Sequence, residues 1–180
     1  LIKNKGVTSL TLTKKMAEKN FKFTSDYDLS IFKWFNKFKT KKPSVIKIKY
    51  GENPNQKAHF ITNVKSNIFN SQINGKKIGY NNILDISEGL KCIDEFQEPT
   101  CVIIKHNNPC GVASAKKIDN AFLKALGSDP ISSFGGVVLL NRSINTKLAK
   151  LINNHFFEVI VSPKFKEEVI EILKKKKNLI

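Results

Sequence analysis

The stretch "TCVIIKHNNPCG", residues 100–111, joins a continuous apolar run to a lysine, a histidine and a set of turn-forming residues. A short, continuous apolar run predicts a strand that is covered on both faces of a sheet. The asparagines, the proline and the glycine that follow it predict a loop. We therefore expect Lys105 and His106 at the carboxyl end of a buried strand, with a loop over residues 107–111 after it.

The sequence after this stretch repeats a pattern of short apolar strands and amphipathic helices. Further buried strands are predicted at residues 137–141, "VVLLN", and 158–162, "EVIVS". Helical spacing of apolar residues predicts helices at about residues 82–96, 119–127, 145–154 and 165–177. This alternation is typical of an α/β fold with a layered, largely parallel sheet flanked by helices. In such sheets ligands bind beyond the carboxyl ends of the strands, where Lys105 and His106 are expected.

The first part of the chain has a different character. Helical spacing predicts two helices, at residues 12–23 and 25–38, the second of them capped by Ser25 or Asp26. A charged stretch with Pro43 follows, and alternating apolar residues then predict a strand that reaches Tyr50. We therefore predict a boundary between residues 1–42 and residues 43–180.

Lys105 and His106 are residue types that carry chemistry at a strand end. A histidine there can act as a general base near neutral pH. An adjacent lysine supplies positive charge for a negative charge that develops in a transition state. The alternative is that Lys105 extends into solvent and His106 caps the loop, and position alone leaves both interpretations open.

Two other segments are candidates for ligand contact. In "SSFGG", residues 132–136, Gly135 and Gly136 would let backbone amides approach a ligand closely. In "KYGENPNQ", residues 49–56, Lys49 and the loop amides could hold a phosphate group. Each segment has a plainer interpretation as an ordinary turn.

The charge of the chain defines a rival function. The sequence has 31 Lys and Arg against 15 Asp and Glu, a net charge of +16, which suits nucleic acid, a membrane surface or an anionic substrate. Arg142 is the only arginine, whereas recognition of phosphates and bases favours the two-pronged guanidinium group. The charge makes a basic module that binds RNA or DNA without catalysis the alternative hypothesis. Because arginine is nearly absent, we expect no nucleic-acid partner.

Composition also bears on membranes and metals. No apolar run approaches the roughly 20 residues that a membrane-spanning helix needs, so we expect no membrane association and a cytoplasmic location. Cys92, Cys101 and Cys110 lie nine residues apart, without the paired spacing of a zinc site. We therefore expect no metal site and three reduced cysteines.

Several segments together resemble one enzyme family. They occur in the order "KYGENPNQKAHF", "INGKKIGYNNILD", "IIKHNNPCGVA", "SDPISSFGGVVLLN" and "FFEVIVSPKFKEEVIEIL". In this order they closely resemble the family that combines AICAR transformylase and IMP cyclohydrolase in purine biosynthesis. Residues 1–42 look like the closing helices and linker of its cyclohydrolase domain, and residues 43–180 like the first half of its transformylase domain. The chain begins with leucine, so we expect it to be a fragment of that bifunctional protein.

The resemblance implies a fold, a reaction and partners. It implies transfer of a formyl group from 10-formyltetrahydrofolate, the co-substrate, to the 5-amino group of AICAR, a step of IMP biosynthesis. It also implies a cytidine-deaminase-like fold, a homodimer with sites shared across the interface, and a possible monovalent cation whose ligands lie outside this sequence. The zinc signature of the deaminases is absent, because Ala113 stands where "PCGVA" would need its second cysteine.

The resemblance also assigns site residues. Lys105 and His106 match the catalytic pair, and Glu158 matches a position on the folate side. The nucleotide contacts are expected at Lys49, Tyr50, Asn82 and Gly135, and we place Asn108 with them because it belongs to the expected loop. Two positions depart from the family pattern: Lys49 replaces the usual arginine, and Asn55 replaces a common histidine. The first exchanges a planar phosphate clamp for a point charge.

Overall fold

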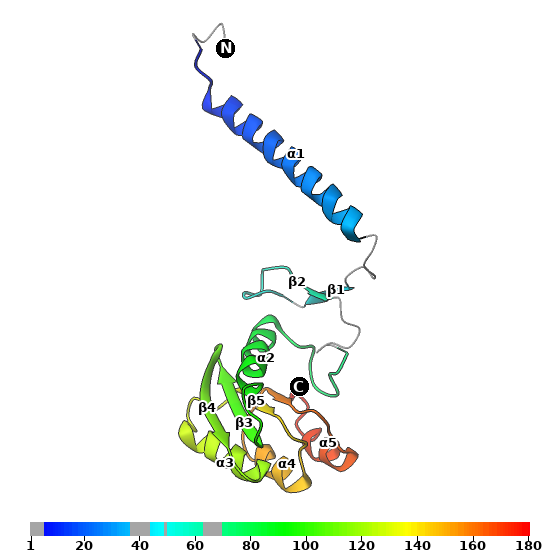
Figure 1. Cartoon of the computed structure of the whole chain (residues 1–180). Coiled ribbons are helices and arrows are strands. Elements are labelled where there is room, and N and C mark those ends of the chain that lie inside the picture. The colour runs from blue at the N-terminus through cyan, green and yellow to red at the C-terminus, as the bar shows by residue number, and fades with distance from the viewer. Residues whose placement is uncertain (1–5, 37–43, 49, 63–69) are drawn as a thin grey trace. The chain divides into compact units, whose positions relative to one another are not determined.

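The computed structural model describes residues 6–36, 44–48, 50–62 and 70–180. These residues belong to two compact units, Leu1–Pro43 and Ser44–Ile180. Among its described residues, 6–36, the first unit forms one helix, α1, Leu10–Asn36 (Figure 1). The second contains a two-stranded sheet and a four-stranded sheet with its helices.

Helix α1 corrects the prediction of two helices at residues 12–23 and 25–38. Ser9 caps it, because its Oγ accepts a hydrogen bond from the amide of Leu12 at 3.2 Å. Ser25 and Asp26 lie inside the helix and cap nothing. Neither glycine nor proline interrupts the segment, and the hydroxyl of Ser30 donates to the carbonyl of Asp26 at 2.7 Å, within the helix. Ser25 and Asp26 are residue types that often begin a helix, but here the helix continues through them.

The second unit opens with a hairpin that was only half predicted. Strand β1, Ser44–Ile48, pairs antiparallel with β2, Ala58–Thr62. The predicted strand toward Tyr50 is β1, whereas its partner β2 was not predicted. The polar loop between them is closed by a hydrogen bond from the amide of Gly51 to the carbonyl of Gln56, at 2.9 Å.

The larger sheet has the strand order β4-β3-β5-β6. Its strands are β3 (Thr100–Lys105), β4 (Asn108–Ser114), β5 (Val137–Leu140) and β6 (Val159–Val161). Its helices are α2 (Tyr80–Ile93), α3 (Ile118–Ser128), α4 (Thr146–Asn153) and α5 (Glu167–Leu173). The predicted α/β class is confirmed, and so are the strands at 100–105, 137–141 and 158–162.

The expectation of a largely parallel sheet is wrong. Strand β3 is antiparallel to both β4 and β5, and β5 with β6 is the one parallel pair among the described strands of this sheet. The cause is the tight hairpin between β3 and β4, which reverses the chain. The crossover through α3 then returns β5 in the direction of β4, so β5 is antiparallel to β3, which lies between them.

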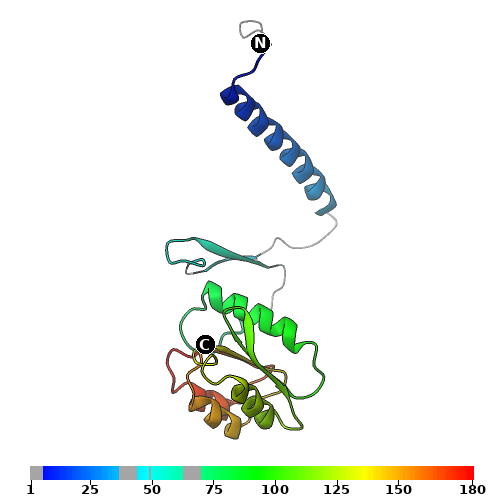
Figure 2. The same cartoon turned by 90° about the vertical axis from the view of Figure 1, so that its left-hand side faces the viewer.

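Strand β3 lies at the centre of the core, as its apolar run predicted. Cys101, Val102, Ile103 and Ile104 are all fully buried. Alternate residues of the strands face α2 on one side and α3, α4 and α5 on the other (Figure 2). Helix α2 approaches closely at Gly89, where an added Cβ would lie 2.2 Å from the side chain of Leu139. The core therefore fixes α2 firmly on the sheet.

Candidate functional site

The Lys105–His106 segment forms a tight hairpin turn and not the start of a loop. Lys105 ends β3 and pairs with Asn108, so only His106 and Asn107 lie between the two strands. Both have left-handed backbone angles, with φ of 53° and 64°. Two successive left-handed residues are what a two-residue hairpin of the type I′ class requires. The predicted loop over residues 107–111 is thus wrong, because most of it belongs to β4.

Strand β4 tolerates Pro109 because it is the edge strand of the sheet. The pairing register of β3 with β4 shifts between Ile103 and Ile104, just before the turn. His106 follows the end of the buried strand, as the sequence predicted, and its side chain is exposed. The structure therefore presents the imidazole on a short projection from a rigid core.

The turn is held by a residue that sequence analysis did not identify. Asp85 of α2 accepts a hydrogen bond from the backbone amide of Asn107, from N to Oδ1 at 2.7 Å. The side-chain amide of Asn108 donates to the carbonyl of His106 at 3.0 Å. A left-handed residue other than glycine costs roughly 1–2 kcal/mol, less for Asn, so these bonds stabilise a turn that is intrinsically unfavourable.

Lys105 is held by the Ser-Phe-Gly-Gly segment. Its ammonium group donates to the carbonyl of Phe134, from Nζ to O at 2.5 Å. The next residue, Gly135, has a φ of 75°, and its amide donates to the carbonyl of Phe156 at 2.8 Å. The rings of Phe134 and Phe156 lie 4.9 Å apart between centroids. The structure therefore brings Lys105 and Gly135, 30 residues apart in sequence, into one cluster.

Hydrogen bonds among residues 129–133, which precede Gly135 in the sequence, fix the loop that leads to it. Asp129 accepts from the amide of Ser132 at 2.9 Å, and the hydroxyl of buried Ser133 donates to the carbonyl of Asp129 at 2.7 Å. The hydrogen bonds from Ser132 lower the pKa of the Asp129 carboxyl below its ordinary value. The loop is thus organised by an ionised aspartate.

Three predicted residues line one hollow of about 510 Å³: Tyr50, Asn82 and Glu158. The side-chain amide of Asn82 donates to Glu158, from Nδ2 to Oε2 at 3.0 Å. The other lining residues were not singled out from the sequence: Lys76, Lys77, Gly79, Tyr80 and Asn81. Lys49 lies outside the described residues, and Asn55 is exposed in the loop between β1 and β2.

The hollow and the hairpin turn are joined through α2 and the Gly-Gly segment. Asn82 and Asp85 are about one helical turn apart on α2, the first bonded to Glu158 and the second to the turn. The amide of Glu158 donates to the carbonyl of Gly136 at 3.0 Å. The candidate site therefore has an exposed imidazole, a fixed ammonium group and a polar hollow within one network.

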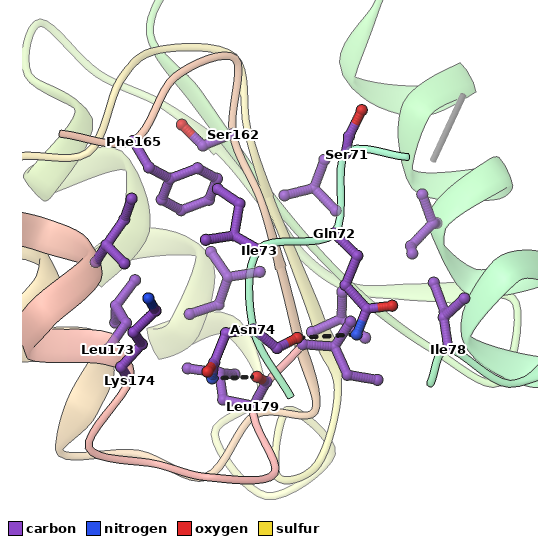
Figure 3. Close-up of a pocket in the computed structure, with 16 residues that line it drawn as sticks. Ser71, Gln72, Ile73, Asn74, Ile78, Ser162, Phe165, Leu173, Lys174 and Leu179 are labelled. Atoms are coloured by element: carbon purple, nitrogen blue, oxygen red, sulfur yellow. Dashed lines mark hydrogen bonds between the residues drawn. The ribbon is translucent and has the colours of Figure 1, made fainter. Parts of the chain in front are cut away.

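A second hollow, of about 140 Å³, has a different character. Figure 3 shows it between residues 71–74 and the segments around Phe165 and Leu173, with apolar side chains around it. The side-chain amide of Asn74 donates to the carbonyl of Leu179 at 2.8 Å and ties the two sides together. None of the predicted site residues lines it, so we assign it to packing.

The cysteines add no chemistry to the site. Burial raises the pKa of the Cys101 thiol far above its ordinary value, and burial followed by the charge of Glu95 raises that of Cys92. Cys110 lies 3.6 Å from the hydroxyl of Ser133, between sulfur and oxygen. In the part of the chain that the structure describes, no group of His, Cys, Asp and Glu side chains could hold a metal ion, and no helix could span a membrane.

The fold and the site together define a class: an α/β domain with a polar hollow beside a lysine–histidine hairpin. Comparison with known proteins gives the family. The family described as "AICARFT/IMPCHase bienzyme" matches residues 1–180, and the chain belongs to this family.

Curated relatives support the same assignment. The protein PurH, described as the bifunctional purine biosynthesis protein, is 41% identical in Caldicellulosiruptor saccharolyticus over 99% of this chain and 38% of the relative. The PurH protein of Bacteroides thetaiotaomicron is 40% identical over 100% of this chain and 36% of its own length. That of Staphylococcus saprophyticus is 39% identical over 97% and 35%. The chain thus spans little more than a third of the length of these relatives.

Proposed function

We propose that this chain provides part of a formyltransferase site, which transfers the formyl group of 10-formyltetrahydrofolate to the 5-amino group of AICAR. The polypeptide that contains it would then be the bifunctional enzyme of purine biosynthesis, with IMP cyclohydrolase as its second activity. Family membership supports the pathway. The observation that carries the step is the hairpin turn, which exposes His106 beside a lysine whose ammonium group is already held.

In this proposal His106 takes a proton from the attacking amine. That amine is conjugated with the imidazole carboxamide of AICAR and is a poor nucleophile, so its attack on the formyl carbon needs a base. Lys105 stabilises the negative charge that develops on the formyl oxygen. When this tetrahedral species collapses, the bond between the formyl carbon and N10 of the folate breaks, and tetrahydrofolate leaves with the proton that His106 had taken. An ammonium group has three donors, and the carbonyl of Phe134 takes one of them, which leaves two for the substrate.

The hollow is proposed to bind the nucleotide. Tyr50 and Asn82 line it, and so do Lys76 and Lys77, which add positive charge. Gly135 follows Phe134, whose carbonyl accepts the hydrogen bond from Lys105, and Asn108 pairs with Lys105 in the sheet. Lys49 is proposed to contact the phosphate on the resemblance alone. Glu158, proposed for the folate side, accepts a hydrogen bond from Asn82, so the two substrate sides are in contact.

The remaining proposals rest on the family resemblance. They are a cytidine-deaminase-like fold for residues 43–180, a homodimer, a cytoplasmic location, and a monovalent cation bound by residues outside this chain. Residues 1–42 are proposed as the closing helix and linker of the cyclohydrolase domain. This suits α1, whose apolar side chains, Phe21, Phe23 and Phe32 among them, are exposed within the described residues.

The test is formyl transfer by a His106→Ala variant of the complete polypeptide, meaning the longest product that the reading frame encodes. Removal of a positioned base typically lowers the rate about 10²–10⁴-fold. His59→Ala is the matched control, because His59 is exposed on β2. Circular dichroism checks the fold of both variants. Activity of His106→Ala within a few-fold of the parent would exclude His106 as the base.

A further inference from the structure

We propose that Asp85 is a positioning residue for formyl transfer: its carboxylate holds the hairpin turn and thereby sets the place of the His106 imidazole. The inference rests on the function proposed above. Its basis is the hydrogen bond from the backbone amide of Asn107 to Oδ1 of Asp85, at 2.7 Å.

The turn needs such an anchor. Its two central residues, His106 and Asn107, are left-handed, and neither is glycine. The ladder between β3 and β4 is irregular between Ile103 and Ile104, so regular strand pairing does not extend evenly to the turn. Strand β4 is also the edge of the sheet and has no neighbour on its other side among the described strands. The contact from α2 therefore supplies a constraint that the hairpin lacks.

Helix α2 is a suitable platform for this anchor. Ile86, next to Asp85, is buried against the sheet, and so is Ile93 two turns further on. Gly89 lets the helix approach Leu139 more closely than any larger residue would allow. The position of the carboxylate is thus set by the core, and the position of the turn follows from the carboxylate.

The same helix links the anchor to the hollow. Asn82, about one turn before Asp85, donates to Glu158 in the wall of the hollow. One rigid helix therefore sets both the turn that carries His106 and a wall of the proposed nucleotide site. A small displacement of reacting groups can cost about 10²-fold in rate, so this alignment matters for turnover more than for binding.

Three variants of the complete polypeptide test the proposal. Asp85→Ala removes the acceptor, Asp85→Asn keeps an acceptor oxygen without the charge, and Glu88→Ala removes a carboxylate from the same helix that pairs with Lys91 and not with the turn. We measure kcat and the apparent KM for AICAR, and the hydrogen-exchange rate of the Asn107 amide. Circular dichroism checks that each variant folds.

Asp85→Ala is expected to lower kcat about 10–100-fold while the KM for AICAR changes less than about twofold. The Asn107 amide should exchange about tenfold faster or more, because its acceptor is gone. Asp85→Asn should restore most of both, and Glu88→Ala should change neither. A purely structural role would lower the amount of folded enzyme in Asp85→Ala and leave its kcat per folded molecule unchanged.

The outcomes separate this inference from the proposed function. Full activity of Asp85→Ala beside an inactive His106→Ala variant overturns the positioning role alone. Unchanged exchange at Asn107 in Asp85→Ala also overturns it, since the bond would then not hold the turn. Full activity of His106→Ala overturns the proposed function and this inference with it.

Discussion

Replacement of Gly135 by alanine tests how the Ser-Phe-Gly-Gly segment is built. Gly135 has a φ of 75°, a conformation in which alanine is less stable by roughly 1–2 kcal/mol. Space is not the obstacle, because an added Cβ would lie 3.5 Å from the ring of Phe156, an ordinary contact. The whole cost is therefore conformational, and we expect Gly135→Ala to lower the free energy of unfolding by about 1–2 kcal/mol.

The matched control is Gly127→Ala. Gly127 lies in the last turn of α3, and an added Cβ there meets nothing within 4 Å. Alanine in a helix is more stable than glycine by roughly 0.5–1 kcal/mol, so this variant should gain stability up to that amount. Equilibrium urea unfolding of both variants measures the difference. If both variants moved in the same direction, the left-handed geometry of Gly135 would not govern its tolerance.

Three further predictions follow from the site. Lys49→Arg, in the complete polypeptide, should lower the apparent KM for AICAR and leave kcat unchanged, because a two-pronged guanidinium group would replace a point charge at the phosphate, which does not react. Steady-state kinetics measure both constants, and an unchanged KM would mean that the phosphate binds elsewhere. The pKa of Asp129 is lowered in the folded state, so its contribution to stability is present above the ordinary value of about 3.9 and is lost as the pH falls through the folded value. The urea midpoint of the parent should therefore fall more between pH 7 and about pH 3 than that of Asp129→Asn, and equal falls would contradict the assignment. The 180-residue chain expressed alone should catalyse neither formyl transfer nor ring closure, because it spans 35–38% of the length of the three relatives compared; turnover comparable to that of the complete polypeptide would show the site to be complete within it.

The predictable part of the fold consists of the elements whose buried side chains form a regular apolar pattern in the sequence. The apolar run from Thr100 to Lys105 predicted a strand covered on both faces, and similar apolar runs predicted β5 and β6. The helices around Ile86 and Leu148 followed from their apolar spacing. In each of these elements a regular pattern of buried side chains determines the structure.

The unpredictable part depends on the backbone and on distant contacts. His106 and Asn107 form a turn that usually needs glycine, so the hairpin resembled a loop, and the direction of β5 was then misjudged. Strand β4 contains Pro109 and Gly111, which normally argue against a strand. Asp85 lies between Leu84 and Ile86 in an ordinary amphipathic helix, and only the tertiary contact with Asn107 distinguishes it.

The structure brings several of the residues that the sequence singled out close together, through contacts that the sequence does not reveal. Tyr50, Asn82 and Glu158 line one hollow, and Lys105 reaches the segment of Gly135. The roles of these residues remain predictions. Their hydrogen bonds could not be predicted, because Asn82 and Glu158 are separated by 76 residues and meet only through the packing of α2 on the sheet.

The most direct test of the account is formyl transfer itself. The complete polypeptide is incubated with AICAR and with 10-formyltetrahydrofolate that carries ¹³C in its formyl group, and the products are analysed by nuclear magnetic resonance. The account predicts that the label appears on the 5-amino nitrogen of AICAR with the parent protein, and about 10²–10⁴-fold more slowly with His106→Ala. A folded parent that binds both substrates but transfers no label would contradict it.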